Sequence, residues 1–129
     1  MPVVLVVDDS PVDRARAGGL LKKATELTPI YAANGREALD AIREHKPDIV
    51  VTDLHMPEID GLEATRLLRS REGTAHLPVI ALSAAVLDAE RAQAHAAGMN
   101  GFVAKPASEA DLLRSLWPFA PTQPGWPTS

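Results

Sequence analysis

Short apolar runs alternate with longer amphipathic stretches along this chain of 129 residues. The apolar runs are rich in β-branched side chains and lie at residues 3–7, 30–33, 49–52, 79–82 and 101–104. Such runs, bounded by turn-forming residues, are typical of strands that are buried on both faces. The amphipathic stretches between them predict helices that cover a parallel sheet. The pattern therefore predicts an α/β fold, a doubly wound sheet of five parallel strands flanked by five helices.

Capping and breaking residues predict where the first helix lies. Ser10 followed by a proline is typical of an N-cap and a first helical residue, and the helix is expected to extend to about Lys23. Gly18 and Gly19 inside it cost about 1 kcal/mol each relative to alanine, which indicates either close helix packing or a local bend. The predicted inward-facing residues are Val12, Ala15, Leu20 and Leu21.

The later helices carry similar signals. Asn34 begins a second helix that ends at Lys46, before a proline. An alanine-rich helix is expected at residues 84–97, with Gly98 as its left-handed C-cap, and Ser108 is expected to cap the last helix. A third helix is expected after the third strand. The inward-facing positions predicted for the second, third and last helices are Ala38, Leu39, Ile42, Leu62, Ala64, Leu67, Leu68, Leu112, Leu113 and Leu116.

Polar side chains follow four of the five predicted strands. Asp8 and Asp9 come after the first, Asp53 after the third, Ser83 after the fourth and Lys105 after the fifth. Ligands of open α/β sheets bind at this carboxyl edge of the strands. Two carboxylates about 4 Å apart repel by roughly 4 kcal/mol at an effective dielectric near 20, and one lysine offsets too little of that charge. The pattern predicts a divalent cation with oxygen ligands, and phosphate as the third party.

Composition excludes several classes of protein. Apolar residues make up 46% of the chain and charged residues 23%, with a net charge of −4, which disfavours direct nucleic-acid binding. The chain has no cysteine, so disulfides and thiolate metal sites are excluded. We expect no membrane span and, in the absence of a basic leader, a cytoplasmic protein.

The last residues differ in character from the rest. Prolines recur there every third position, which is one turn of polyproline II, at Pro118, Pro121, Pro124 and Pro127. We predict one domain over residues 1–117 and a Pro-rich tail or linker stub over 118–129. A ligand for an aromatic-lined groove is the alternative interpretation of this segment.

Four sequence blocks, present in order, together resemble the signature blocks of the bacterial two-component response-regulator receiver domain. The resemblance covers roughly residues 3–117 and includes the chemotaxis-regulator-like members of that family. It implies a flavodoxin-like sheet with strand order 2-1-3-4-5. The blocks are Val6-Val7-Asp8-Asp9-Ser10, Thr52-Asp53-Leu54-His55-Met56-Pro57-Glu58-Ile59-Asp60-Gly61, Ala81-Leu82-Ser83-Ala84 and Lys105-Pro106.

The resemblance implies a role for each polar residue. Asp53 would be the phospho-acceptor, a carboxylate nucleophile that forms an acyl phosphate. Lys105 would pair with one phosphoryl oxygen, and the Ser83 hydroxyl would donate to another. The implied metal is Mg²⁺ or Mn²⁺, with ligands from Asp8, Asp9, Asp53 and the main-chain carbonyl of His55.

The resemblance also implies a conformational switch and residues that set the rate of self-hydrolysis. Once phosphate is in place, Ser83 would move toward it, and Phe102 would fill the space left, changing the face formed by the fourth helix, fifth strand and fifth helix. His55 and Ala85 occupy positions that tune self-hydrolysis in this family. Because Ala85 has no group that orients an attacking water, we predict slow loss of the phosphoryl group.

The predicted function is a phosphoacceptor receiver domain in a two-component system or phosphorelay. The implied donor is a histidine kinase or histidine phosphotransfer protein, and the implied target is an effector protein or domain, with a phosphorylation-dependent dimer as a further possibility. The chain would catalyse its own phosphorylation and dephosphorylation and turn over no external substrate. Two alternatives stay open: an aspartate-nucleophile phosphohydrolase, and an interaction module of the same fold that is not phosphorylated.

Overall fold

The computed structural model describes residues 3–24, 27–54, 61–83, 88–105 and 108–116, apart from the side chains of Ala24, Glu72 and Glu109. Within these residues, strands and helices alternate as predicted. The strands are β1 Val3–Val7, β2 Thr28–Ala32, β3 Ile49–Thr52, β4 Val79–Ser83 and β5 Gly101–Ala104. The helices are α1 Pro11–Ala24, α2 Gly35–His45, α3 Gly61–Arg69, α4 Asp88–Ala97 and α5 Glu109–Leu116, with a 3₁₀ turn, η1, at Glu72–Thr74.

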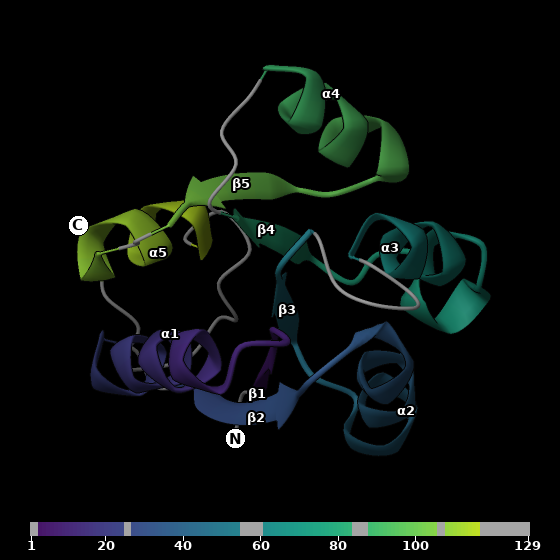
Figure 1. The fold of residues 1–129 in the computed structure, drawn as a ribbon. Helices are drawn as coiled ribbons and strands as arrows, with labels where there is room; N and C mark the ends of the chain where they lie inside the picture. The colour runs from purple at the N-terminus through teal and green to yellow at the C-terminus, as the bar shows by residue number, and fades with distance from the viewer. Residues whose placement is uncertain (1–2, 25–26, 55–60, 84–87, 106–107, 117–129) are drawn as a thin grey trace.

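The five strands form one parallel sheet in the order β2-β1-β3-β4-β5. In Figure 1, α1 and α5 cover one side of this sheet, and α2, α3 and α4 cover the other. The predicted doubly wound α/β fold, with its flavodoxin-like strand order, is confirmed. The order of the strands also reverses direction between β1 and β3, which is where such sheets bind their ligands.

Alternation along β1 divides the core into two layers. Leu5 and Val7 pack with residues of α2, α3 and α4, whereas Val4 and Val6 pack with residues of α1 and α5. All four side chains are almost completely buried. Because both faces of such a strand are buried, all its residues are apolar, and the first polar residue follows the end of the strand. That residue is Asp8.

The predicted inner face of α1 is wrong in part. Ala17 and Leu21 are buried and Leu20 is half-buried, but Ala15 is exposed and Val12 is 76% exposed. At 3.6 residues per turn, Val12 and Ala15 lie about 140° and 160° around the helix from Ala17. They therefore face away from the sheet, and the small residues of this helix gave no clear apolar stripe from which to choose the face.

The glycine pair in α1 is explained by close packing. A Cβ atom built on Gly18 would collide with the hydroxyl of Tyr31 on β2 and would lie 2.7 Å from its Cζ atom. Gly19, in contrast, has nothing within 4 Å. Gly18 thus lets the Tyr31 ring lie against the helix backbone, and no bend is needed to account for it.

The caps of the later helices agree with the predictions. Asn34 caps α2 by accepting a hydrogen bond from the Glu37 amide at 2.9 Å. Ser108 accepts one from the Asp111 amide at 3.1 Å, and Gly98 has a φ of +101° after α4. Of the predicted inward positions, Ala38, Ile42, Leu62, Ala64, Leu68, Leu112 and Leu116 are buried, and Leu39, Leu67 and Leu113 are half-buried.

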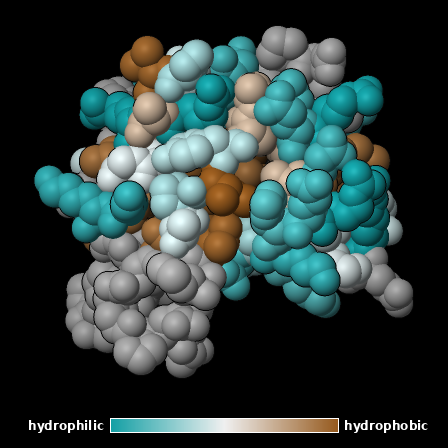
Figure 2. All heavy atoms as spheres, turned by 90° about the horizontal axis from the view of Figure 1, so that it is seen from below, coloured by the Kyte–Doolittle hydropathy of each residue, from teal (hydrophilic) through white to brown (hydrophobic). Residues whose placement is uncertain are grey.

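The face of the molecule that Figure 2 shows is mostly hydrophilic. Viewed from the side that carries β2, hydrophilic side chains cover most of the described atoms, and hydrophobic ones appear in patches between them (Figure 2). The large hydrophobic side chains exposed among the described residues are Val12 and Tyr31. None of the described helices has the length and apolar character that crossing a membrane requires.

Candidate functional site

Hydrogen bonds between main chains fix the positions of the polar residues beyond the strand ends. The Asp53 amide donates to the Val7 carbonyl at 2.9 Å, which continues the β1–β3 pairing one residue past β3. The Lys105 amide likewise donates to the Ser83 carbonyl at 2.9 Å, past the end of β5. Asp8, directly after β1, lies at the same edge. The predicted convergence of these residues at the carboxyl edge of the sheet is therefore present.

Three carboxylates come together at this edge. One oxygen from each of Asp8, Asp9 and Asp53 lies within 4.8 Å of the others. Asp8 is buried, with 2% of its surface exposed, Asp53 keeps 13% of its side-chain surface exposed, and Asp9 is exposed. The group therefore runs from the protein interior to the solvent, so that an ion could reach it from outside.

The ammonium group of Lys105 lies among the carboxylates. Its Nζ atom is 2.7 Å from Oδ2 of Asp8, 3.1 Å from Oδ2 of Asp53 and 3.1 Å from Oδ2 of Asp13. Burial alone would lower the pKa of Lys105, because only 15% of its side-chain surface is exposed and the charged form is poorly solvated. The hydrogen bonds and charges of the three carboxylates outweigh burial, so the pKa of Lys105 lies well above its usual value. The lysine is charged and serves as the counter-ion of this edge.

Asp13 is a member of the site that the sequence prediction missed. It is the third residue of α1, and its amide is 3.3 Å from the hydroxyl oxygen of the N-cap residue Ser10. The Ser10 amide in turn donates to Oδ1 of Asp8 at 2.9 Å. Because only three residues separate α1 from β1, the first turn of α1 lies at the same edge of the sheet. An acidic residue in that turn was the available signal.

The donor set suits a hard cation. The acidic groups that converge here are the carboxylates of Asp8, Asp9 and Asp53, and carboxylate oxygens are the ligands that Mg²⁺, Mn²⁺ and Ca²⁺ prefer. The residues that would hold such an ion are Asp8, Asp9 and Asp53. The fourth predicted ligand, the carbonyl of His55, lies outside the described residues.

The two predicted switch residues lie on the neighbouring strands. Ser83 ends β4 and is 2% exposed, beside the ends of β3 and β5. Phe102 is half-buried on β5, and the Arg91 guanidinium of α4 lies 5.1 Å from the centre of its ring. Ala85, predicted to tune hydrolysis, lies outside the described residues, as does the Pro-rich segment 118–129.

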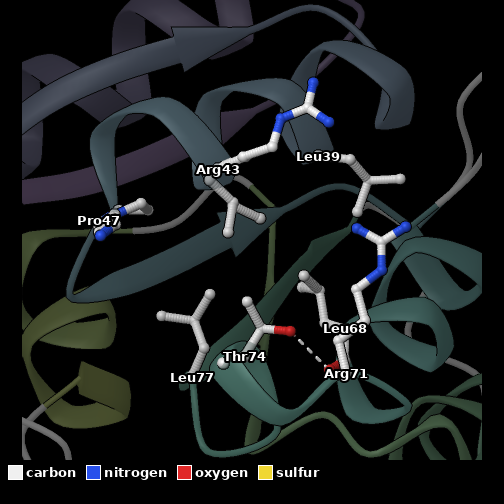
Figure 3. Close-up of a pocket in the computed structure, with 10 residues that line it drawn as sticks. Leu39, Arg43, Pro47, Leu68, Arg71, Thr74 and Leu77 are labelled. Carbon is white, nitrogen blue, oxygen red and sulfur yellow. Dashed lines mark hydrogen bonds between the residues drawn. The ribbon is translucent and has the colours of Figure 1, made fainter.

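A separate hollow of about 500 Å³ lies between α2, α3 and η1 (Figure 3). The segments that connect α2 to β3 and α3 to β4 contribute to it, so it opens at the amino edge of the strands, opposite the carboxylates. Its lining residues are Leu39, Ile42, Arg43, Lys46, Pro47, Leu68, Arg71, Gly73, Thr74 and Leu77. None of the converging carboxylates lines it, so the candidate site is the polar edge and not this hollow.

The sequence of the chain is similar to those of known proteins. The family model of the response regulator receiver domain matches residues 4–116. The chain is 33% identical to the polar-differentiation response regulator DivK of Brucella anthropi, over 88% of this chain and 91% of the relative. It is 34% identical to the probable histidine kinase 4 of Oryza sativa over 90% of this chain, but it spans only 14% of that protein's length.

A solved structure extends the likeness to the fold. The receiver domain of the sensor histidine kinase PA1611 from Pseudomonas aeruginosa, with a magnesium ion coordinated in its active-site cleft, superposes with a TM-score of 0.83. The two are 31% identical, and the match covers 92% of this chain and 96% of the other. With the strand order and the acidic edge described above, these matches lead to one conclusion. The chain belongs to the response regulator receiver domain family of two-component signalling.

Proposed function

We propose that the chain takes a phosphoryl group from a phosphohistidine onto Asp53, with Mg²⁺ or Mn²⁺ bound at the acidic edge. The observation that supports this is the contact of one lysine with Asp8 and Asp53 inside a group of three carboxylates. An oxygen of Asp53 attacks phosphorus, and the phosphorus–nitrogen bond of the donor breaks. The imidazole leaves with the electron pair of that bond, and Asp53 becomes an acyl phosphate.

The residues around Asp53 have distinct tasks in this reaction. The metal ion would offset negative charge on the phosphoryl oxygens, and Asp8, Asp9 and Asp53 would hold it. Lys105, already charged and 3.1 Å from Oδ2 of Asp53, would bind a phosphoryl oxygen. Ser83 would donate its hydroxyl hydrogen to another. The hydrogen bond from the Asp53 amide to β1 keeps the main chain of the nucleophile in place meanwhile.

The same reaction supplies a signal. Movement of Ser83 toward the new anion would open space beside β4, and the Phe102 ring on β5 would enter it. The face formed by α4, β5 and α5 would then present a different surface to an effector protein or domain, or to a second copy of the chain. We propose that the protein switches in this way and turns over no external substrate.

The donor would be a histidine kinase or a histidine phosphotransfer protein. The relatives support this class of partner: one is a response regulator, one is a probable histidine kinase of which the chain matches 14%, and one is the receiver domain of a sensor histidine kinase. The magnesium ion in the PA1611 domain supports the choice of metal.

Intact mass after incubation with acetyl phosphate and MgCl₂ tests the proposal. The wild type is expected to gain the mass of one phosphoryl group, and Asp53→Asn is expected to gain none, because an amide is not a nucleophile. Asp40→Asn, an exposed residue of α2, is the matched control and should behave as the wild type. Equal labelling of the wild type and Asp53→Asn would assign the reaction elsewhere, and steady release of product from a phosphate ester would indicate a phosphohydrolase.

A further inference from the structure

Lys105 contacts more carboxylates than phosphoryl transfer to Asp53 requires. Its ammonium group has three hydrogens, and Asp8, Asp53 and Asp13 lie within hydrogen-bond distance of Nζ. No hydrogen of this group is left over for a new anion. A phosphoryl oxygen that pairs with Lys105 must therefore replace one of the three carboxylates.

The three carboxylates differ in how easily they can be replaced. Asp8 is 2% exposed, and its other oxygen accepts a hydrogen bond from the Ser10 amide at 2.9 Å. Asp53 is itself the proposed acceptor. Asp13 comes from α1 rather than from a strand end, and 43% of its side-chain surface is exposed. Water can therefore solvate the Asp13 carboxylate when the lysine leaves, which makes it the partner that is least costly to exchange.

Asp13 also differs from the others in its relation to a metal ion. The oxygens of Asp8, Asp9 and Asp53 converge within 4.8 Å, and Asp13 is not part of that group. A cation held there would compete with Lys105 for Asp8 and Asp53, since the lysine now contacts both. Asp13 would then be the carboxylate that keeps the ammonium group at the site.

We propose that Asp13 is a positioning residue for Lys105. It tethers the ammonium group beside the acidic edge, and it competes for that group with an anion on Asp53. The competition with an anion on Asp53 rests on the proposed function. The positioning of Lys105 by Asp13 concerns the unphosphorylated protein and does not depend on it.

Hydrogen–nitrogen correlation spectra of the lysine ammonium groups test the tether in Mg²⁺-loaded, unphosphorylated protein. The proteins compared are the wild type, Asp13→Asn, Asp13→Glu and the control Asp40→Asn. A cooperative unfolding transition in urea first establishes that each of the four is folded. Loss of the tether in Asp13→Asn is expected to speed exchange of the Lys105 ammonium hydrogens with water, and Asp13→Glu should retain part of their protection. An unchanged Lys105 signal in Asp13→Asn would overturn the proposal.

The rate of labelling by acetyl phosphate tests the competition. A half-exposed ion pair is worth up to about 1 kcal/mol, so Asp13→Asn is expected to accelerate labelling about twofold to fivefold. Asp13→Glu and Asp40→Asn should stay near the wild-type rate. If Asp13 served only the helix dipole, Asp13→Asn would lower stability and leave the rate unchanged, which would overturn the competition. If the wild type takes up no phosphoryl group, the proposed function and the competition both fail, and the ammonium spectra still decide the tether.

Discussion

Replacing Lys105 by methionine should reveal how strongly the acidic edge depends on its own counter-ion. Methionine keeps most of the length of the side chain and removes the charge. In the wild type the ammonium group contacts Asp8 at 2.7 Å and Asp53 at 3.1 Å, and 15% of the lysine side chain is exposed. In Lys105→Met these two carboxylates lose the ammonium group that contacts both of them. We therefore expect the variant to be less stable to unfolding than the wild type without metal, and to regain most of that stability in Mg²⁺.

The magnitude follows from the separation of the carboxylates. Their converging oxygens lie within 4.8 Å, which corresponds to a repulsion of at least about 3.5 kcal/mol at an effective dielectric near 20. Removing one partner of a buried ion pair typically costs about 3–5 kcal/mol, in agreement with that figure. Because one edge of the site is open to water, we take the lower end, about 3 kcal/mol. For a domain of this size the loss should lower the melting temperature by about 10 °C.

Thermal and urea unfolding, followed by circular dichroism in EDTA and in millimolar MgCl₂, measure the effect. In EDTA, Lys105→Met is expected to unfold about 10 °C below the wild type. In MgCl₂ most of the difference should disappear, because the ion replaces the lysine as counter-charge and binds more tightly without a competitor. Lys22→Met, an exposed lysine of α1, is the control and should respond little to either solution. The reasoning is refuted if Lys105→Met matches the wild type in EDTA, or if Mg²⁺ stabilises both proteins equally.

Three further predictions concern the surroundings of the site. Gly19→Ala should raise the free energy of unfolding by about 0.8 kcal/mol, whereas Gly18→Ala should gain less or lose, since its Cβ would collide with Tyr31; urea unfolding compares the two. Gly61→Ala should slow labelling by acetyl phosphate, because its Cβ would collide with the carbonyl of Asp53 and displace the nucleophile; a normal rate would contradict this. The acyl phosphate should decay slowly in excess Mg²⁺ and faster in Ala85→Glu, and identical decay would refute the role assigned to position 85.

The central strands of the sheet were predictable because they are buried on both faces. The runs around Val4–Val7 and Ile49–Thr52 are continuous and apolar, so neither strand left a choice of inward face. A helix does leave that choice. In α1, alanine and glycine occupy most of the buried side, and Val12, the largest apolar residue of its first turn, is exposed. Apolar periodicity placed Leu20 and Leu21 correctly but Val12 and Ala15 on the wrong side, because small residues share the buried face of α1 with the leucines.

The site was predictable to the extent that it consists of strand ends. Asp8, Asp53 and Lys105 each follow a strand directly, so that the parallel sheet alone brings them to one edge. Asp13 belongs to a helix, and its position depends on how closely α1 begins after β1. That closeness is set by the N-cap at Ser10, which sequence reasoning identified without drawing the consequence for the next turn.

Formal charge shows why movement, rather than charge alone, would carry the signal. Four carboxylates, those of Asp8, Asp9, Asp13 and Asp53, oppose the ammonium group of Lys105 and the guanidinium of Arg14, which donates to the Asp8 carbonyl at 2.8 Å. The edge therefore carries two negative charges in excess. A bound divalent cation would cancel this excess. An acyl phosphate brings about two negative charges but consumes the carboxylate charge of Asp53, so the net change is only about one charge. A change this small, screened at an open edge, acts over a short range. The groups that must respond are therefore those that can reach the new oxygens, and Lys105 can do so only by giving up one of its contacts with Asp8, Asp13 and Asp53.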